Sequence, residues 1–188
     1  MPRILATGFA LILLVLCVGI ASAQIPFIGV YFDNTWQAEA TMACQCPPDG
    51  TIDTLYIALT NANTFVTGVE FKVNYPAVAF SYLGDIWTQP VTVGTTATGI
   101  SMGWPNPQNG FTTIPICGVI IVWNCGGCCP QTDIPLSVVT NPNTTFLGFT
   151  DFPNFLPVPA VGLTSTICAC SIPVEESTWG KVKSLYQE

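Results

Sequence analysis

The cysteines are the main residues of this chain that could take part in chemistry. The 188-residue sequence has nine cysteines and no histidine. Cys17 lies in an apolar run near the N-terminus, and the other eight form a C-x-C pair, a single cysteine with a C-x-x-C-C cluster, and a second C-x-C pair. These eight are Cys44, Cys46, Cys117, Cys125, Cys128, Cys129, Cys168 and Cys170. An even number of cysteines in an exported chain predicts disulfides, here four, whose connectivity the spacing alone leaves open.

The two C-x-C pairs admit a disulfide and a metal interpretation. Alternation along a strand places Cys44 and Cys46 on one face, and Cys168 and Cys170 likewise, so two cross-strand bridges can form if the strands are neighbours. The same four sulfurs could instead hold zinc, but C-x-C lacks the usual C-x-x-C spacing and export disfavours free thiolates. The segment Cys125–Cys128 matches a redox C-x-x-C motif, but no βαβ pattern surrounds it. We expect disulfides, no metal ion and no other cofactor.

The side chains available for catalysis are few. Without histidine, a serine or cysteine nucleophile lacks its usual base. Glycoside hydrolysis needs only two carboxylates, and none of those in the body of the chain stands in a recognisable motif. They are Asp33, Glu39, Asp49, Asp53, Glu70, Asp85, Asp133 and Asp151. We therefore predict that the protein is not an enzyme, and a carboxylate-based glycoside hydrolase is only the third hypothesis.

Three tryptophans beside turn residues, Trp36, Trp87 and Trp104, are candidates for sugar binding. Sugar-binding sandwiches use exposed aromatic rings as stacking platforms, and Trp104 in Gly103–Pro107 is the strongest candidate. The alternative for each ring is packing at the end of the domain, because eleven phenylalanines and five tryptophans must fill one core. A carbohydrate-binding module, with a polysaccharide ligand, is accordingly the second hypothesis.

Charge restricts the partners of the protein. Four basic residues stand against eleven acidic ones, which gives a formal net charge of −7. Nucleic acid and anionic membrane surfaces need a positive field, so neither is expected as a partner. Charged residues make up only 8% of the chain and hydrophobic ones 49%, the opposite of the disordered signature. The chain is therefore expected to fold as one domain.

The chain begins with an expected signal peptide over residues 1–23. Arg3, an apolar run over Ile4–Ile20 and Ala21-Ser22-Ala23 match the charged, hydrophobic and cleavage regions of such a signal. An uncleaved membrane anchor is the alternative. We expect a secreted or cell-surface protein without membrane contact after cleavage. It would consist of a β domain over residues 24–173 and a short amphipathic helical tail over residues 174–188.

Period-two alternation dominates the body of the chain and predicts an all-β fold. The sharpest case places Val69, Phe71 and Val73 on one face and Glu70 and Lys72 on the other. Turn signals, including Pro105–Gly110, punctuate the strands, and about nine strands indicate a β-sandwich or jelly roll. Strands are predicted at Phe27–Phe32, Thr54–Thr60, Gly68–Asn74, Ala77–Tyr82, Val91–Val93, Gly99–Met102, Ile116–Trp123, Ile134–Thr140, Thr145–Phe149 and Leu163–Cys170.

A family resemblance rests on two stretches. Gly50, the strand Thr54–Thr60, an Asn-rich turn and the segment Val66–Pro76 resemble the opening of cohesin-like domains, and Gly118–Val122, a Gly-rich turn and Asp133–Val138 resemble their later hairpin. The resemblance implies a nine-stranded jelly roll with one binding face, the face that cohesins present to dockerin modules. The eight cysteines depart from the family pattern. The tail Thr178–Tyr186 is similar to the endings of secreted bacterial proteins.

These observations predict a secreted, disulfide-stapled, non-catalytic module for protein–protein binding, adhesion or surface assembly. Outer strand faces with little charge can pair, and Lys72 is the one lysine of the body that opposes such pairing. We expect a protein partner, or self-association, through a sheet face. If the cohesin likeness holds, Glu70 and Lys72 lie at the charged centre of that face.

Overall fold

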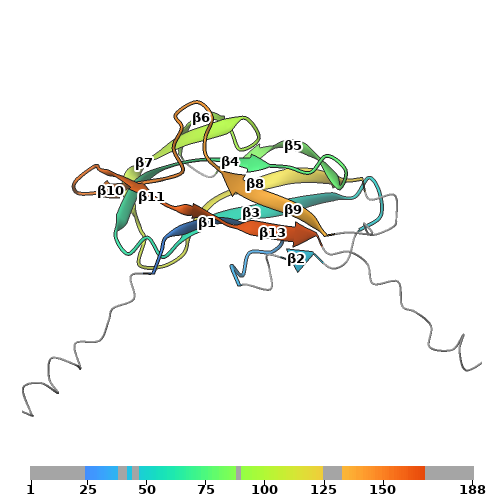
Figure 1. Cartoon of the computed structure of the whole chain (residues 1–188), viewed down its shortest axis with the longest axis horizontal. Coiled ribbons are helices and arrows are strands. Elements are labelled where there is room, and N and C mark those ends of the chain that lie inside the picture. Colours follow the sequence, from blue (N-terminus) through green and yellow to red (C-terminus); the bar gives the residue numbers. More distant parts are fainter. Residues whose placement is uncertain (1–23, 38–41, 44–46, 88–89, 125–132, 168–188) are drawn as a thin grey trace, which may run out of the picture.

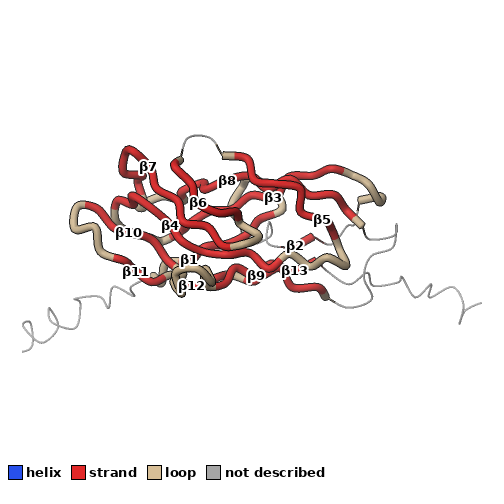
Figure 2. Tube along the Cα trace, turned by 90° about the horizontal axis from the view of Figure 1, so that it is seen from above, coloured by secondary structure: helices blue, strands red, loops and turns tan. Residues whose placement is uncertain are grey.

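The computed structural model describes residues 24–37, 42–43, 47–87, 90–124 and 133–167, and among these residues all regular structure is β. Thirteen strands form two sheets that face each other (Figures 1 and 2). The predicted all-β sandwich is confirmed. The predicted C-terminal helix lies outside the described residues, within which no helix is long and apolar enough to span a membrane.

The smaller sheet has the strand order β12-β1-β3-β8-β5. Its strands are β1 (Phe27–Tyr31), β3 (Ile52–Thr60), β5 (Phe80–Ile86), β8 (Ile114–Trp123) and β12 (Val161–Gly162). The larger sheet has the order β11-β10-β4-β9-β13-β2, with β7 paired to β4 and β6 paired to β7. Its strands are β2 (Met42–Ala43), β4 (Phe65–Asn74), β6 (Val91–Thr95), β7 (Gly99–Asn109), β9 (Ile134–Val139), β10 (Gly148–Phe152), β11 (Pro157–Pro159) and β13 (Thr164–Ile167).

The hydrophobic core fills the space between the two sheets. Val69, Phe71 and Val73 of β4 are buried, as their alternation predicts, and they belong to one cluster with the inward residues of β3 and β8. Trp123 ends β8 in this core, where its ring packs edge to face on Phe80 at 5.6 Å between centroids. Full burial of each such side chain contributes about 1.5 to 3 kcal/mol to folding.

The predicted turn at Pro105–Gly110 is wrong, because β7 continues to Asn109. Strand β6 covers β7 only as far as Gly103, which pairs with Val91. In the pairing of β7 with β4, Pro105 and Pro107 fall within a register shift between Gly103 and Gln108, so their missing N–H donors are tolerated, as at bulges and edge strands. The turn comes instead at Gly110, where a Cβ atom would lie 2.2 Å from the carbonyl oxygen of Thr64.

The cysteine predictions divide between described and undescribed residues. Cys117 lies on β8 as a free, buried thiol, opposite Ile57 in the register and within the core cluster. The structure thus differs from the predicted disulfide at Cys117, because this side chain packs in the apolar core. The other seven cysteines lie outside the described residues. The strands that lead into the two C-x-C pairs are neighbours, since β2 and β13 pair in parallel with Met42 opposite Thr166 and Ala43 opposite Ile167.

This register predicts which cysteines are joined. Cys44 follows Ala43 and Cys168 follows Ile167, so continuation of the pairing would bring Cys44 opposite Cys168 and Cys46 opposite Cys170. We expect a disulfide within each of these two pairs. Mass spectrometry of a non-reduced peptic digest should recover the peptide with residues 44–46 linked to the peptide with residues 168–170. Free thiols at these positions, or a native mass that includes zinc, would contradict the expectation.

Candidate functional site

Strand β4 lies in the middle of the larger sheet and carries the residues predicted for binding. Opposite residues in antiparallel strands share a face, so the register identifies what surrounds them. Glu70 lies opposite Ser101 of β7 on one side and opposite Gly148 of β10 on the other. Lys72 lies opposite Val139 of β9. The alternation of β4 therefore places Glu70 and Lys72 on the outer face, as predicted.

The outer face next to Glu70 ends in two exposed valines. Gly68 of β4 lies opposite Gly103 of β7, which in turn lies opposite Val91 of β6. Val93 lies opposite Ser101 in the same way. Val91 and Val93 are 74% and 72% exposed, although both are apolar. We call Gly68, Ser101, Gly103, Val91 and Val93 the valine face.

A loop between β9 and β10 crosses this outer face at Glu70. Asn141 and Phe146 bridge each other, and Asn141, only 1% exposed, donates through Nδ2 to the carbonyl oxygen of Ile100 on β7 at 3.0 Å. The Phe146 ring lies over Gly148, where a Cβ atom would be 2.6 Å from it. Beneath this loop, Oε2 of Glu70 is buried with no hydrogen-bond partner among the described residues. Glu70 is central, as predicted, but it is partly covered.

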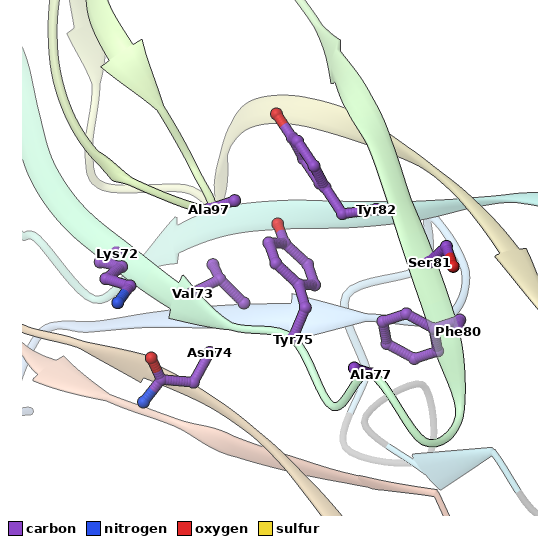
Figure 3. Close-up of a pocket in the computed structure, with 9 residues that line it drawn as sticks. All are labelled: Lys72, Val73, Asn74, Tyr75, Ala77, Phe80, Ser81, Tyr82 and Ala97. Carbon is purple, nitrogen blue, oxygen red and sulfur yellow. The ribbon is translucent and has the colours of Figure 1, made fainter.

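Lys72 lies at the other end of β4, beside a cavity of about 500 Å³. Tyr75 and Tyr82 line this cavity with their rings stacked, 5.2 Å apart between centroids. Figure 3 shows both hydroxyl groups pointing the same way, whereas the amine of Lys72 and the amide of Asn74 point away from them. The charge of Lys72 therefore faces outward. It does not face the stacked rings of Tyr75 and Tyr82, which we call the aromatic wall of the cavity.

The aromatic wall of this cavity is fixed by hydrogen bonds to Asp85. The hydroxyl groups of Tyr75 and Thr96 lie 2.7 Å apart, and Thr96 donates to Asp85 through its backbone N at 2.9 Å and its Oγ1 at 2.5 Å. Burial raises the pKa of Tyr75 far above its ordinary value. Burial also raises the pKa of Tyr82, and the Asp85 charge adds to that effect. Both phenols stay neutral at physiological pH and can take part in hydrogen bonds.

The three predicted tryptophans do not meet in the structure. Trp36 packs edge to face on Tyr31 at 5.6 Å and on Tyr56 at 6.0 Å, against the smaller sheet. Trp36 and Tyr56 line a second cavity of about 460 Å³. Trp87 and Trp104 are partly buried and pack against the main core. All three rings are thus partly packed against the body of the domain, and sugar binding through them stays a prediction.

Several carboxylates accept hydrogen bonds that stabilise the fold. Asp53 accepts from the Trp123 ring nitrogen at 3.2 Å, and Asp85 holds Thr96 as described above. Asp33 accepts from the hydroxyl and backbone N of Thr35, which lower its pKa in that order. Among the described residues no cluster of three potential metal ligands occurs.

Comparisons with known proteins give matches to solved structures. No family profile and no curated protein matches the sequence. A cohesin module of a family 33 glycoside hydrolase from Clostridium perfringens superposes with a TM-score of 0.52 and 8% identity, covering 77% of this chain and 96% of the module. A type III cohesin module of the cell-surface anchoring scaffoldin ScaE from Ruminococcus flavefaciens gives 0.50 and 9%, covering 82% and 93%.

A third structure is CaCohA2 from Clostridium acetobutylicum in a complex with CaDoc0917. It superposes with a TM-score of 0.50 and 14% identity, covering 77% of this chain and 99% of that one. At such identities the likeness shows the fold alone. The described residues form a cohesin-like β-sandwich, as the sequence resemblance predicts.

The first prediction from this site concerns the crossing loop. The substitution Asn141→Ala removes the hydrogen bond to the Ile100 carbonyl oxygen. It also removes Oδ1, which accepts from the backbone N of Asn143 at 3.0 Å, so buried polar groups are left without a partner. The free energy of unfolding should fall by about 1 to 3 kcal/mol. Urea unfolding measures this change, with Asn106→Ala on exposed β7 backbone as the matched control. Equal stability of both variants would show that the loop is not anchored through Asn141.

The second prediction concerns Cys117. Burial, with a smaller contribution from the Asp85 charge, raises the pKa of this thiol well above its usual range. Alkylation needs the thiolate, so iodoacetamide should leave Cys117 unmodified in the native protein at mildly alkaline pH and modify it in guanidinium chloride. The folded pKa lies above the unfolded one, so the stability linked to this proton falls as the pH rises past the ordinary thiol pKa. Rapid native labelling would contradict the burial.

Proposed function

We propose that this cohesin-like β-sandwich is a secreted, non-catalytic module that binds another protein through the outer face of its larger sheet. The observation that carries the proposal is the valine face. Val91 and Val93 of β6 are 74% and 72% exposed, beside Gly103 and Ser101 of β7. Exposed contiguous apolar surface marks interaction sites in folded proteins.

The edge of the larger sheet supports the same proposal. Among the strands that the structure describes, β6 pairs with β7 alone, so within this part of the chain its other side has no strand partner. Neither lysine nor an acidic side chain lies within Val91–Thr95, although edge strands are normally protected in that way. A partner strand, or a second copy of the chain, can therefore add to this edge while its side chains meet the valines.

The comparisons add support of a coarser kind. CaCohA2, which shares the fold, was solved in a complex with CaDoc0917, and the ScaE module belongs to a cell-surface anchoring scaffoldin. Export of the present chain rests on its predicted signal peptide at residues 1–23. Its acidic character and its single described base, Lys72, favour an uncharged or basic partner over a strongly acidic one.

A charge placed on the valine face tests the proposal. Val93→Lys should fold normally, because the side chain is exposed, but it should weaken partner binding at least about tenfold, or ~1.4 kcal/mol, by burying an unpaired ammonium group. Affinity capture from the extracellular fraction of the source bacterium, followed by quantitative mass spectrometry, compares wild type with this variant.

Leu83→Lys is the matched control, because Leu83 is 57% exposed on β5 of the smaller sheet. Equal capture by Val93→Lys and wild type would reject the valine face as the docking site. Turnover in an esterase, protease or glycosidase assay that one carboxylate substitution abolishes would reject the non-catalytic assignment.

A further inference from the structure

One end of the sandwich exposes a cluster of large apolar side chains. Phe65 begins β4, Phe111 follows β7, Phe152 ends β10, and Phe155 and Leu156 come from the β10–β11 connection. Their exposed fractions are 45%, 64%, 37%, 62% and 59%, in that order. We call these five residues the aromatic end. Figures 1 and 2 both show the β10–β11 connection at the left end of the molecule.

The five side chains form one continuous surface. The rings of Phe65 and Phe111 lie 5.9 Å apart at 83°, and those of Phe152 and Phe155 lie 5.6 Å apart at 89°. Phe65 and Phe152 are direct cross-strand partners, so the two ring pairs adjoin. Leu156 follows Phe155 in the chain and extends this surface.

Hydrogen bonds hold the β10–β11 connection in place. Oδ1 of Asp151 accepts from the Leu156 backbone N at 2.6 Å, and its Oδ2 accepts from Nδ2 of Asn154 at 3.0 Å. The backbone N of Asp151 also donates to the Leu156 carbonyl oxygen at 3.0 Å. Within this closed turn Phe155 has a φ of 57°, which is unfavourable for a bulky side chain. The fold thus maintains a strained conformation that directs a phenyl ring into solvent.

The neighbouring β7–β8 turn is held in the same manner. Oδ1 of Asn109 accepts from the Phe111 backbone N at 3.1 Å, and the backbone N of Gly110 donates to the Thr64 carbonyl oxygen at 3.0 Å. The aromatic end is therefore preorganised, which lowers the entropy lost when a partner binds.

Charge is scarce at the aromatic end. The segments that form it contain one ionisable side chain, Asp151, and both of its carboxylate oxygens accept hydrogen bonds within the turn. Lys72, the one basic side chain among the described residues, lies seven residues along β4 from Phe65, roughly 23 Å away. The matching surface of a partner is accordingly uncharged and apolar.

The aromatic end continues the proposed docking face. Phe65 and Phe152 are an outward pair of β4 and β10, on the face that also carries Gly68 and Glu70. The loop bridged by Asn141 and Phe146 covers part of this face near Glu70, and Phe65 and Phe152 lie beyond it toward the start of β4.

We propose that the aromatic end anchors the protein partner by binding an uncharged segment with exposed leucine or aromatic side chains. This inference rests on the proposed function and deepens it by naming the chemistry of the partner. Aromatic residues, phenylalanine included, are enriched at protein interfaces, where a few buried anchors carry most of the binding energy. Within each pair the rings are nearly perpendicular, so they do not form the coplanar platform that sugar stacking uses.

Random peptides displayed on phage are the probe for this surface. Selection on the wild-type protein should enrich uncharged peptides that contain leucine and aromatic residues. Their affinity, measured by biolayer interferometry with synthetic peptide, should fall at least tenfold in Phe155→Gly and again in the double variant with Phe111→Ser. Glycine adopts a φ of 57° without strain, so Phe155→Gly should be at least as stable as wild type, and thermal unfolding checks this.

The matched control is Ile52→Ser with Leu83→Ser, two residues that are 68% and 57% exposed in the smaller sheet. Charged enriched peptides, or peptides that bind Phe155→Gly and the double variant as well as wild type, would overturn the proposal. So would co-sedimentation with phosphatidylcholine vesicles, or a dimer in sedimentation velocity, if Phe155→Gly abolished either. If Val93→Lys loses the partner while the phenylalanine variants keep it, this inference fails and the proposed function stands.

Discussion

Strand β4 pairs with β7 along one edge and with β9 and then β10 along the other, and this pairing positions both faces of the larger sheet. Its inward residues Val69, Phe71 and Val73 are fixed by the core. Because side chains alternate along β4, Glu70 and Lys72 must lie on the outer face. Because β9 and β10 take successive parts of one edge, the chain between them must leave the sheet, and the loop with Asn141 and Phe146 results. The accessible outer surface is what that loop leaves uncovered.

With charged side chains so scarce, the few carboxylates act on the backbone and on polar hydrogens nearby. Asp151 closes the β10–β11 turn, Asp85 holds Thr96, and Asp53 meets the Trp123 ring nitrogen. Each arrangement satisfies a polar group that would otherwise cost free energy at the margin of the core. The remaining surface is therefore built from small, hydroxyl-bearing and apolar side chains. For binding at such a surface, shape and desolvation matter more than charge.

Period-two alternation is a local signal, and so it predicts the sandwich and the orientation of Glu70 and Lys72 correctly. The turn signal at Pro105–Gly110 is misleading, because the pairing of β7 with β4, which sequence does not reveal, decides that the strand continues there through a register shift. Burial of Glu70 Oε2 is likewise beyond sequence reasoning, since it depends on how the β9–β10 loop crosses the sheet. The aromatic end depends on tertiary structure in the same way. Phe65, Phe111 and Phe155 come from three separate parts of the chain, and a single clue is the Phe152–Phe155 spacing beside turn residues.

The position of Lys72 has a consequence for the resistance of the protein to proteolysis. Between Arg3 and Lys181 it is the one residue after which a trypsin-like protease can cut. Lys72 lies inside β4, paired with Val139, and such proteases cut preferentially at exposed, flexible chain. Cleavage there must wait until the central strand of the sandwich opens, which is among the rarest fluctuations of a domain. The scarcity of basic residues thus makes the folded domain a poor substrate for an entire class of digestive enzymes.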